Sequence, residues 1–393
     1  MKKLKIALLF ISFYLLRWLS LPAELPPTWT PESRVRFTAT VIEQPEYTDT
    51  NTIVRVGVWY VNLRGYAEII PGSRVSFIGK AEPKLLGNKI VKIVMMDPIF
   101  EVVEGNRCER SFEAGCIRIG ILNMRRNWVA ILEKTLPEPM SSLAAGILLG
   151  VKGQMPRDFY DSLVATGTLH IVAASGYNVS IVAIVIMKIM TIMFGRVIAV
   201  GCAILGIMGY VLIAGAGASV VRAGIMGSLT LIAYYFGRPA QARRLLWIAA
   251  AIMLLFDPLI IFDIGFQLSF VATFGLLYLE PWMTKLHSRS VGALHSGSVR
   301  GQSGLDKFLT AYLYPTLEAT IATLPIILYQ FGKVSYISPL VNILILPIVP
   351  MIMAITGAVI GVGVFVPGMA QIIAWVLYPL LWYMVAVIRL FNI

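Results

Sequence analysis

The sequence predicts an α-helical polytopic membrane protein with a small all-β module near its N-terminus. Hydrophobic residues make up 58% of its 393 residues, and the mean hydropathy is +0.78. An ordinary soluble domain has roughly 45 to 50% apolar residues. Apart from one apolar stretch at the N-terminus, the long apolar stretches follow residue 130, whereas residues 30–116 are mixed and polar. We therefore expect a soluble module followed by a helical domain in the membrane.

The chain begins with a predicted membrane anchor. Lys2, Lys3 and Lys5 precede an apolar run at residues 6–21, as in a signal sequence, but no small-x-small cleavage site follows the run. We expect an uncleaved anchor whose start lies in the cytoplasm, and we assign residues 1–29 to this anchor and a linker.

Residues 30–105 carry the pattern of short β-strands. The β-rich runs are separated by turn residues and lie at 34–42, 52–61, 74–80 and 89–94. This spacing predicts about five strands in an extracytoplasmic all-β barrel like the oligonucleotide-binding (OB) fold. Trp59, Tyr60 and Phe77 either stack on the bases of a nucleic acid or fill the core of the barrel.

Three shorter helical patterns follow the β-module. Residues 106–139 place basic residues between apolar residues at helical spacing, which predicts an interfacial amphipathic helix on the membrane surface. Residues 141–151 are apolar but too short to cross about 30 Å of hydrocarbon, so we expect them to be re-entrant or buried in protein. Residues 156–165 predict a second interfacial helix that begins at Pro156.

The polytopic membrane domain is assigned to residues 140–393. Its candidate spans, which with the anchor make about nine, are residues 171–193, 197–214, 220–236, 245–261, 264–279, 309–331, 339–362 and 369–390. The loops between the spans are alternately rich in basic residues and almost free of them. Because cytoplasmic loops are enriched in Lys and Arg, we expect the N-terminus in the cytoplasm and both the β-module and the C-terminus outside it.

The formal net charge of +12 comes from 33 Lys and Arg against 21 Asp and Glu. An excess of basic residues in cytoplasmic loops is one explanation. A polyanionic ligand such as nucleic acid is the other. Composition leaves both explanations open.

Cysteine and histidine usage bounds the disulfide and metal chemistry. Cys108 and Cys116 lie in the soluble part, where an oxidising compartment would favour a disulfide between them, and Cys202 lies in an apolar stretch. The three histidines are scattered, and no Cys-x-x-Cys pair occurs. We therefore expect no metal site and no cofactor.

Polar residues interrupt the predicted spans where glycine and proline break the helices. Such groups are costly in a bilayer and are usually kept because something polar binds or passes there. The residues predicted to line a pathway or bind a ligand are His170, Ser175, Gly176, Asn178, Arg222, Asp263, Gln267, Glu318 and Asn342. Arg222 is expected to pair with Asp263 or Glu318, in a pathway or in a structural ion pair. A channel or transporter is the favoured class.

An intramembrane hydrolase is the enzymatic alternative, with Ser175 as nucleophile and His170 as base. Residues five apart on a helix lie about 140° from one another, which is poor geometry for a direct hydrogen bond. The sequence has no Gly-x-Ser-x-Gly elbow around Ser175. We therefore expect no catalytic residues.

Short runs of the membrane domain follow one another in a recognisable order. They are GILLG at 146–150, GTLHIVAASGYNV at 167–179, RAGIM at 222–226, Asp257-Pro258 and GFQLSF at 265–270, followed by Pro325, Asn342 and Pro347. Their order and spacing resemble the signature of the ComEC competence proteins, the inner-membrane channel for DNA uptake in natural transformation. The resemblance covers roughly residues 140–393.

The resemblance implies a domain that passes one DNA strand across the inner membrane into the cytoplasm, with residues 34–103 as an extracytoplasmic barrel. The family usually has a second histidine where this chain has Asn178, so a proton-linked or metal role for two histidines is not expected. Longer members end in a metallo-β-lactamase-like domain assigned to strand degradation. This sequence ends at Ile393 without a His-x-His-x-Asp-His motif, so we expect a separate nuclease.

We therefore predict a channel component for single-stranded DNA, with a transporter of a small or anionic solute as the alternative. The sequence has no nucleotide-binding Gly-rich loop, so ATP-driven pulling would come from a cytoplasmic ATPase or helicase. The other expected partners are membrane lipid and an extracytoplasmic DNA receptor.

Overall fold

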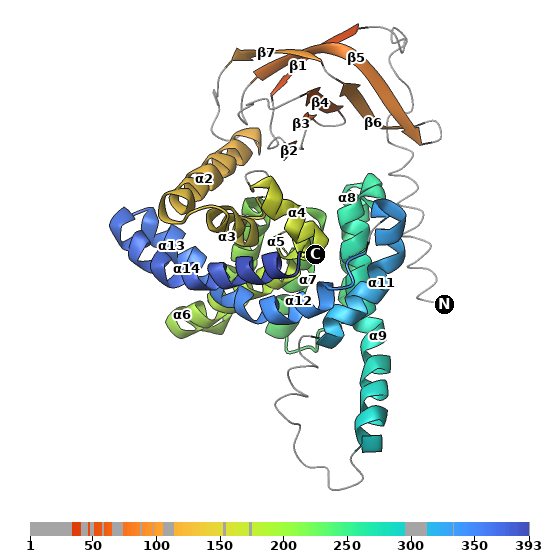
Figure 1. Cartoon of the computed structure of the whole chain (residues 1–393), viewed down its shortest axis with the longest axis vertical. Coiled ribbons are helices and arrows are strands. Elements are labelled where there is room, and N and C mark those ends of the chain that lie inside the picture. The colour runs from red at the N-terminus through yellow and green to blue at the C-terminus, as the bar shows by residue number, and fades with distance from the viewer. Residues whose placement is uncertain are drawn as a thin grey trace. The chain divides into compact units, whose positions relative to one another are not determined.

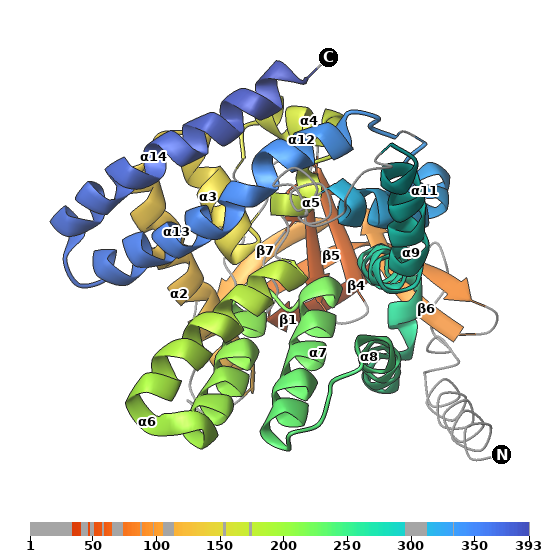
Figure 2. The same ribbon diagram turned by 90° about the horizontal axis from the view of Figure 1, so that it is seen from below.

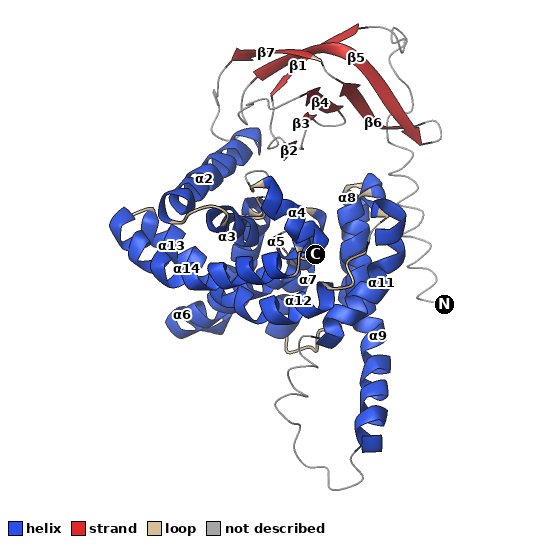
Figure 3. Cartoon of the chain, viewed as in Figure 1, coloured by secondary structure: helices blue, strands red, loops and turns tan. Residues whose placement is uncertain are grey.

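A computed structural model divides the chain into two compact units, Met1–Asn127 and Trp128–Ile393. It describes residues 34–40, 46–47, 51–56, 59–64, 74–86, 89–96, 98–104, 114–151, 155–172, 175–294, 313–332 and 334–392. The described strands all lie between residues 34 and 104, and the described helices all begin at residue 114 or later (Figure 3). The predicted order of a β-module followed by a helical domain is therefore confirmed.

Seven described strands pair into one sheet in the first unit. They are β1 (Arg34–Thr40), β2 (Glu46–Tyr47), β3 (Asn51–Val56), β4 (Trp59–Arg64), β5 (Arg74–Leu86), β6 (Lys89–Met96) and β7 (Ile99–Glu104). The order is β1-β5-β6-β4-β3-β2, and β7 also pairs with β5. The β4–β6 pair is parallel, whereas the other pairs are antiparallel.

The long strand β5 organises this sheet. Its first half pairs with β1 and β7, so that Phe77 lies opposite both Phe37 and Phe100, and its second half pairs with β6. Phe77 is fully buried, as are Val61 and Val75. Phe77 therefore belongs to the core, and its predicted alternative role of stacking on bases is wrong.

The strands differ from the prediction in number, since seven are described where about five were expected, and in two boundaries. Residues 52–61, expected as one run, are divided between the antiparallel strands β3 and β4. β5 continues to Leu86, well beyond the predicted end at residue 80. The described pairings run from β1 to β2 without closing on themselves. An OB-like barrel therefore stays a prediction.

The helices run from the end of the first unit through the second. They are α2 (Ala114–Thr135), α3 (Met140–Leu149), α4 (Arg157–Ala165), α5 (Leu169–Val172), α6 (Gly176–Ile213), α7 (Ala218–Tyr235), α8 (Ala242–Phe256), η1 (Pro258–Phe262), α9 (Ile264–Leu294), α11 (Tyr314–Phe331), α12 (Ser338–Ile345), η3 (Leu346–Ile348), α13 (Val349–Gly363) and α14 (Pro367–Leu390). Among the described residues, four helical stretches are long and apolar enough to span a membrane: Gly176–Ile213, Ala218–Tyr235, Ser338–Gly363 and Pro367–Leu390. The total of nine spans stays a prediction.

The helix α6 folds back on itself at Gly195. The backbone of Gly195 has φ 77° and ψ 173°, a conformation that glycine adopts at little cost because it has no Cβ. A Cβ on Gly206 would lie 2.1 Å from Cδ1 of Ile186, so the arms at 176–194 and 196–213 pack against each other. Figure 2 shows them as a hairpin beside α7.

The remaining long helices pack in two groups. α13 and α14 lie beside α3 and the end of α2 (Figure 1) and share a core with them. In the other group, α9 and α11 cross closely at Gly275, where a Cβ would lie 2.9 Å from the backbone oxygen of Glu318 and 2.5 Å from Cβ of Ala322. Glycine is therefore required for this crossing.

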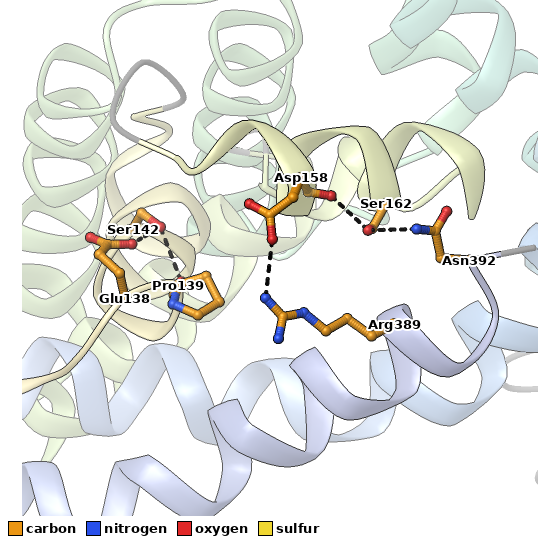
Figure 4. A network of polar contacts seen from close by, with 7 residues as sticks. All are labelled: Glu138, Pro139, Ser142, Asp158, Ser162, Arg389 and Asn392. Carbon is orange, nitrogen blue, oxygen red and sulfur yellow. Dashed lines mark hydrogen bonds and ion pairs between the residues drawn. The ribbon is translucent and has the colours of Figure 1, made fainter.

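The end of the chain is tied to the short helix α4 (Figure 4). The amide of Asn392 donates to the hydroxyl of Ser162 over 2.9 Å, and Ser162 donates to the carbonyl of Asp158 over 2.8 Å. Arg389 pairs with the carboxylate of Asp158 at 3.3 Å. The side chains of Arg389 and Asp158 are 53% and 71% exposed, so their ion pair contributes little to stability. The bond from Asn392 to the buried Ser162 therefore contributes more to this contact.

The α9–α11 crossing generates a stability prediction. Gly275→Ala forces a methyl group against backbone and should lower stability by about 1–3 kcal/mol. Gly357→Ala is the matched control, since it also lies inside a helix but has no heavy atom within 4 Å of its Cβ position among the described residues. The control should leave stability unchanged or raise it by up to about 1 kcal/mol. Thermal unfolding of the purified variants in detergent checks both. A Gly275→Ala protein that melts at the wild-type temperature would contradict the close crossing.

Candidate functional site

The C-terminal end of α3 lies in an apolar interior and takes hydrogen-bond donors from α6. Nine of the ten residues of α3 are buried, and the last carbonyls of any helix lack donors within it. The amide of Asn178 donates to the carbonyl of Ile147 over 2.7 Å, and the hydroxyl of Tyr210 donates to the carbonyl of Leu148 over 2.9 Å. The side chain of Asn178 is therefore committed to holding α3 in place.

The N-terminal end of α3 is satisfied by the carbonyl of Pro137, which accepts from the N–H groups of Met140 over 3.0 Å and Ser141 over 3.2 Å. The carboxylate of Glu138 accepts hydrogen bonds from the hydroxyls of Ser141 and Ser142, the latter over 2.6 Å (Figure 4). A negative charge at this end also favours the helix dipole. Both ends of this short buried helix thus have polar partners, as the prediction of a segment buried in protein requires.

Small residues bring the broken helices into close contact. A Cβ on Gly146 would lie 2.3 Å from Cγ1 of Val172, so α3 lies directly against α5. A Cβ on Gly176 would lie 3.2 Å from Cβ of Ala223, so the start of α6 lies against the first turns of α7. Gly176, a predicted site residue, therefore lets two helix ends meet.

The turn at Gly167 gathers three polar side chains. Gly167 has φ +69°, and a Cβ there would lie 2.8 Å from Cβ of Ser338. Its carbonyl accepts from Nδ1 of His170 over 2.9 Å and from the hydroxyl of Ser338 over a long 3.4 Å. The amide of Asn342 in turn donates to Ser338 over 3.4 Å. The structure thus brings His170 and Asn342, which are far apart in the sequence, to one turn.

The hydrogen bond to Gly167 assigns the tautomer of His170. Because a carbonyl only accepts, the neutral ring carries its proton on Nδ1 and leaves Nε2 as the acceptor atom. Although the side chain of His170 is exposed as a whole, desolvation by the surrounding protein lowers its pKa, and the hydrogen bond to Gly167 opposes that shift. The neutral form is therefore favoured near pH 7.

Arg222 lies buried at the start of α7, and no counter-ion faces it among the described residues. Its side chain is 9% exposed, and neither Nε nor Nη1 has a hydrogen-bond partner in the described part of the chain. Its Nη2 lies 3.8 Å from the Cβ position of Gly176, at the first turn of α6. The expected ion pair with Asp263 or Glu318 is not formed among the described residues, so that prediction is wrong.

Ser175 is the N-cap residue of α6, but its side chain does not cap the helix. Its hydroxyl donates to Oδ1 of Asn178 over 3.2 Å instead. The backbone N–H groups at the start of this helix are therefore not covered by the residue type that usually covers them.

Asp263 and Gln267 make local contacts at the start of α9. The carboxylate of Asp263 accepts from the backbone N–H of Phe266 over 2.7 Å and so caps α9. The amide of Gln267 donates to the carbonyl of Ile261 over 2.8 Å. Both side chains thus tie η1 to α9. At the other end of η1, the carboxylate of Asp257 accepts from the N–H of Leu259 over 3.0 Å.

The other predicted site residues lie apart from this junction or outside the described side chains. Glu318 is 3% exposed in α11, at the crossing with α9. The side chains of Cys108 and Cys116 lie outside the described residues, so their disulfide is a prediction. No group of three or more His, Cys, Asp or Glu side chains in the described ranges is arranged to hold a metal ion.

Basic and aromatic side chains pair at one end of the α6–α9 helices. Arg196, beside the turn of α6, donates to the carbonyl of Tyr234 and stacks 4.0 Å over its ring. Arg243, at the start of α8, donates to the carbonyl of Leu277 over 3.0 Å and lies 4.9 Å over the ring of Tyr278. Rings and cations of this kind are enriched at membrane interfaces. Arg222 belongs to the opposite ends of the same helices.

Sequence reasoning missed two residues that bond to broken helix ends, Tyr210 at the end of α3 and Ser338 at the turn of Gly167. A tyrosine inside an otherwise apolar span needs a partner for its hydroxyl, which is the signal that points to Tyr210. Ser338 precedes Pro339 at the start of a helix and has no comparable signal. The junction, defined here as Ser175, Gly176, Asn178 and Arg222, holds four of the predicted site residues.

The long apolar helices and the polar groups buried at their broken ends define a polytopic helical membrane protein. A family model described as "Competence protein" matches residues 147–393. Since this match covers more than half of the chain, the chain belongs to the competence protein family.

Two curated relatives are similar to the chain over more than half of its length. ComE operon protein 3 of Bacillus subtilis (strain 168) is 27% identical over 244 residues, which cover 62% of this chain and 29% of the relative. Competence protein ComA of Neisseria gonorrhoeae is 28% identical over 220 residues, which cover 52% of this chain and 28% of the relative. The chain therefore matches less than a third of the length of either relative. No solved structure matches the chain.

The bond from Tyr210 to α3 generates a second stability prediction. Tyr210→Phe removes the only side-chain donor described for Leu148 O and leaves that carbonyl unpaired in an apolar interior, which should cost about 1–3 kcal/mol. Tyr383→Phe is the matched control, because its hydroxyl reaches the carbonyl of Leu344 over 3.4 Å from an exposed position. Melting temperatures in the same detergent compare the two. Equal melting of both variants would show that the end of α3 does not depend on Tyr210.

Proposed function

We propose that the chain acts in DNA uptake, as the membrane channel through which one DNA strand enters the cytoplasm in natural transformation. The observation that carries the proposal is the family match over residues 147–393, which include the whole junction around Ser175 and Arg222. Both relatives carry competence or competence-operon names. The β unit would then be an extracytoplasmic OB-like module that receives the strand.

The buried polar junction suits the transport of a charged strand. Each nucleotide carries one negative charge, so the walls of a pathway must offer dipoles or cations. The start of α6 offers a helix dipole, and the neighbouring Arg222 offers a cation. A single cation binds a phosphate without holding the strand so tightly that it cannot move on.

The orientation follows from the basic end of the helices. Arg196 and Arg243, with the neighbouring Arg238 and Arg244, lie at one end of α6, α7 and α8. This basic end supports an orientation in which it faces the cytoplasm. The junction then lies in the extracytoplasmic half of the membrane domain, where an incoming strand arrives. A cytoplasmic ATPase or helicase would pull the strand into the cell, and an extracytoplasmic DNA receptor would deliver the strand to the channel.

A transporter for a small anionic solute is the second candidate. The observation that favours it is the same unpartnered Arg222, since one cation at a helix start is also how a transporter can hold a carboxylate or phosphate. The hydrolase has less support, because His170 bonds to Gly167 whereas Ser175 bonds to Asn178. We propose that the membrane domain is not catalytic.

Transformation of a deletion strain tests the proposed function. Loss of the gene should abolish recovery of transformants and the arrival of labelled DNA in the cytoplasm, while binding of DNA at the cell surface persists. A plasmid-borne wild-type copy is the control and should restore both. A deletion strain that transforms normally but fails to take up an anionic solute would favour the transporter instead.

Cysteine labelling tests the proposed orientation. In a background without native cysteines, Asp161→Cys in α4 should react with a membrane-impermeant maleimide in intact spheroplasts. Arg238→Cys, in the exposed loop after α7, should react only after the membrane is opened, since basic loops are cytoplasmic. The reverse pattern would contradict the orientation. Labelling of denatured protein controls for the amount of each variant.

A further inference from the structure

We propose that Arg222 and the first turn of α6 form a binding site for one phosphate group. The inference rests on the proposed function for its ligand, the phosphodiester of a DNA strand. Its geometry stands independently, on the buried guanidinium, the start of the helix and the glycine between them.

The guanidinium of Arg222 is buried with hydrogen-bonding capacity to spare. The side chain is 91% buried, since 9% of its surface is exposed, and Nε and Nη1 lack partners among the described residues. A charge buried without a partner is strongly unfavourable. An anion bound to Arg222 would supply the partner that the described residues do not, and would explain why the guanidinium is buried.

The start of α6 presents a second positive end at the same place. The first N–H groups of a helix have no acceptors within it, and they carry the positive end of the helix dipole. The usual acceptor would be the N-cap side chain, but the hydroxyl of Ser175 is turned toward Asn178. Helix starts of this kind bind phosphate and other oxyanions.

Gly176 leaves the space between the two positive groups free of a side chain. Nη2 of Arg222 lies 3.8 Å from the Cβ position of Gly176, and the methyl of Ala223 lies 3.2 Å from it. A side chain at 176 would therefore lie in contact with both Ala223 and the guanidinium of Arg222. Two small residues therefore shape the space in which the anion would bind.

A phosphate diester matches this arrangement better than a point-like anion. It carries one negative charge on two equivalent oxygens, and the planar guanidinium donates two parallel N–H groups to such a pair. Asp263 and Glu318, the acidic side chains expected to occupy Arg222, do not pair with it. A lipid headgroup offers the same diester as a DNA strand, so the test must separate the two sources.

Binding and melting of the full chain in a phosphate-free sugar detergent test the site. The probes are inorganic phosphate, a fluorescent oligothymidylate, the same oligomer with uncharged methylphosphonate linkages, and phosphatidylglycerol. Wild-type protein should be stabilised by phosphate and bind the charged oligomer but not the uncharged one. Arg222→Gln should lose phosphate stabilisation and bind the charged oligomer about tenfold more weakly. Arg196→Gln, which removes a cation at the other end of the helices, should behave as wild type.

The melting temperature without ligand separates a binding role from a structural one. Because Arg222 is buried and its Nε and Nη1 have no partner in the described residues, Arg222→Gln should melt at or above the wild-type temperature when no anion is present. Arg222→Lys keeps the charge but not the paired donors, and should bind with intermediate affinity. An Arg222→Gln protein that melts well below wild type, or that phosphate stabilises equally, would overturn the site.

The outcomes distinguish this inference from the proposed function. If the deletion abolishes transformation but Arg222→Gln transforms normally at wild-type protein level, the function stands and the phosphate site falls. If the deletion transforms normally but phosphate still stabilises wild type and not Arg222→Gln, the site stands and the function falls. If phosphatidylglycerol displaces inorganic phosphate from the wild-type protein but the charged oligomer does not, the phosphate site is supported and its ligand is lipid.

Discussion

The membrane domain depends on one constraint: every backbone group at a broken helix end must find a polar partner in an apolar interior. The bond from Asn178 to the carbonyl of Ile147 is the clearest case, since it closes the buried end of α3 with a side chain from α6. Tyr210 meets the same need at the next carbonyl of α3, and His170 meets it at the turn of Gly167. Once these groups are paired, short helices such as α3 and α5 can lie among long apolar ones without leaving an unsatisfied carbonyl.

The side chain of Arg222, unlike these backbone groups, has nitrogens without a hydrogen-bond partner among the described residues, and this marks it as a candidate functional residue. Polar side chains that build the domain, such as Asn178 and Asp263, have their partners within the chain. Arg222 has two buried donor nitrogens without partners in the described residues, next to a helix start that its own N-cap side chain leaves uncovered. Arg222 is thus a buried cation whose partner is not found among the described residues, whereas Asn178 and Asp263 have partners within the chain.

Much of the fold could be predicted from sequence because apolar length and helix breakers are local properties. The short helix predicted at 156–165 is α4, which begins one residue later, and the predicted buried segment at 141–151 is α3. The span predicted to begin at residue 171 was less accurate, since α5 ends at Val172 and α6 begins at Gly176. A hydropathy average passes over such a break, because its polar residues are few and small.

The candidate site was predicted as a set of residues but not as an arrangement. Charge and polarity single out Arg222, Asp263 and Glu318, yet only distances show that Arg222 pairs with neither acid. In the same way, Asn178 could be identified as a polar group at membrane depth, but its role in holding α3 depends on a carbonyl 31 residues away. Contacts of this kind depend on tertiary packing, which no local pattern encodes.

The two bonds that hold α3 come from opposite arms of the α6 hairpin, and they grip consecutive carbonyls of one short helix. A helix with one such hydrogen bond can rotate about it, whereas a helix bonded from two sides cannot rotate without breaking one of the bonds. The two bonds therefore restrict rotation of α3 relative to both arms of the hairpin.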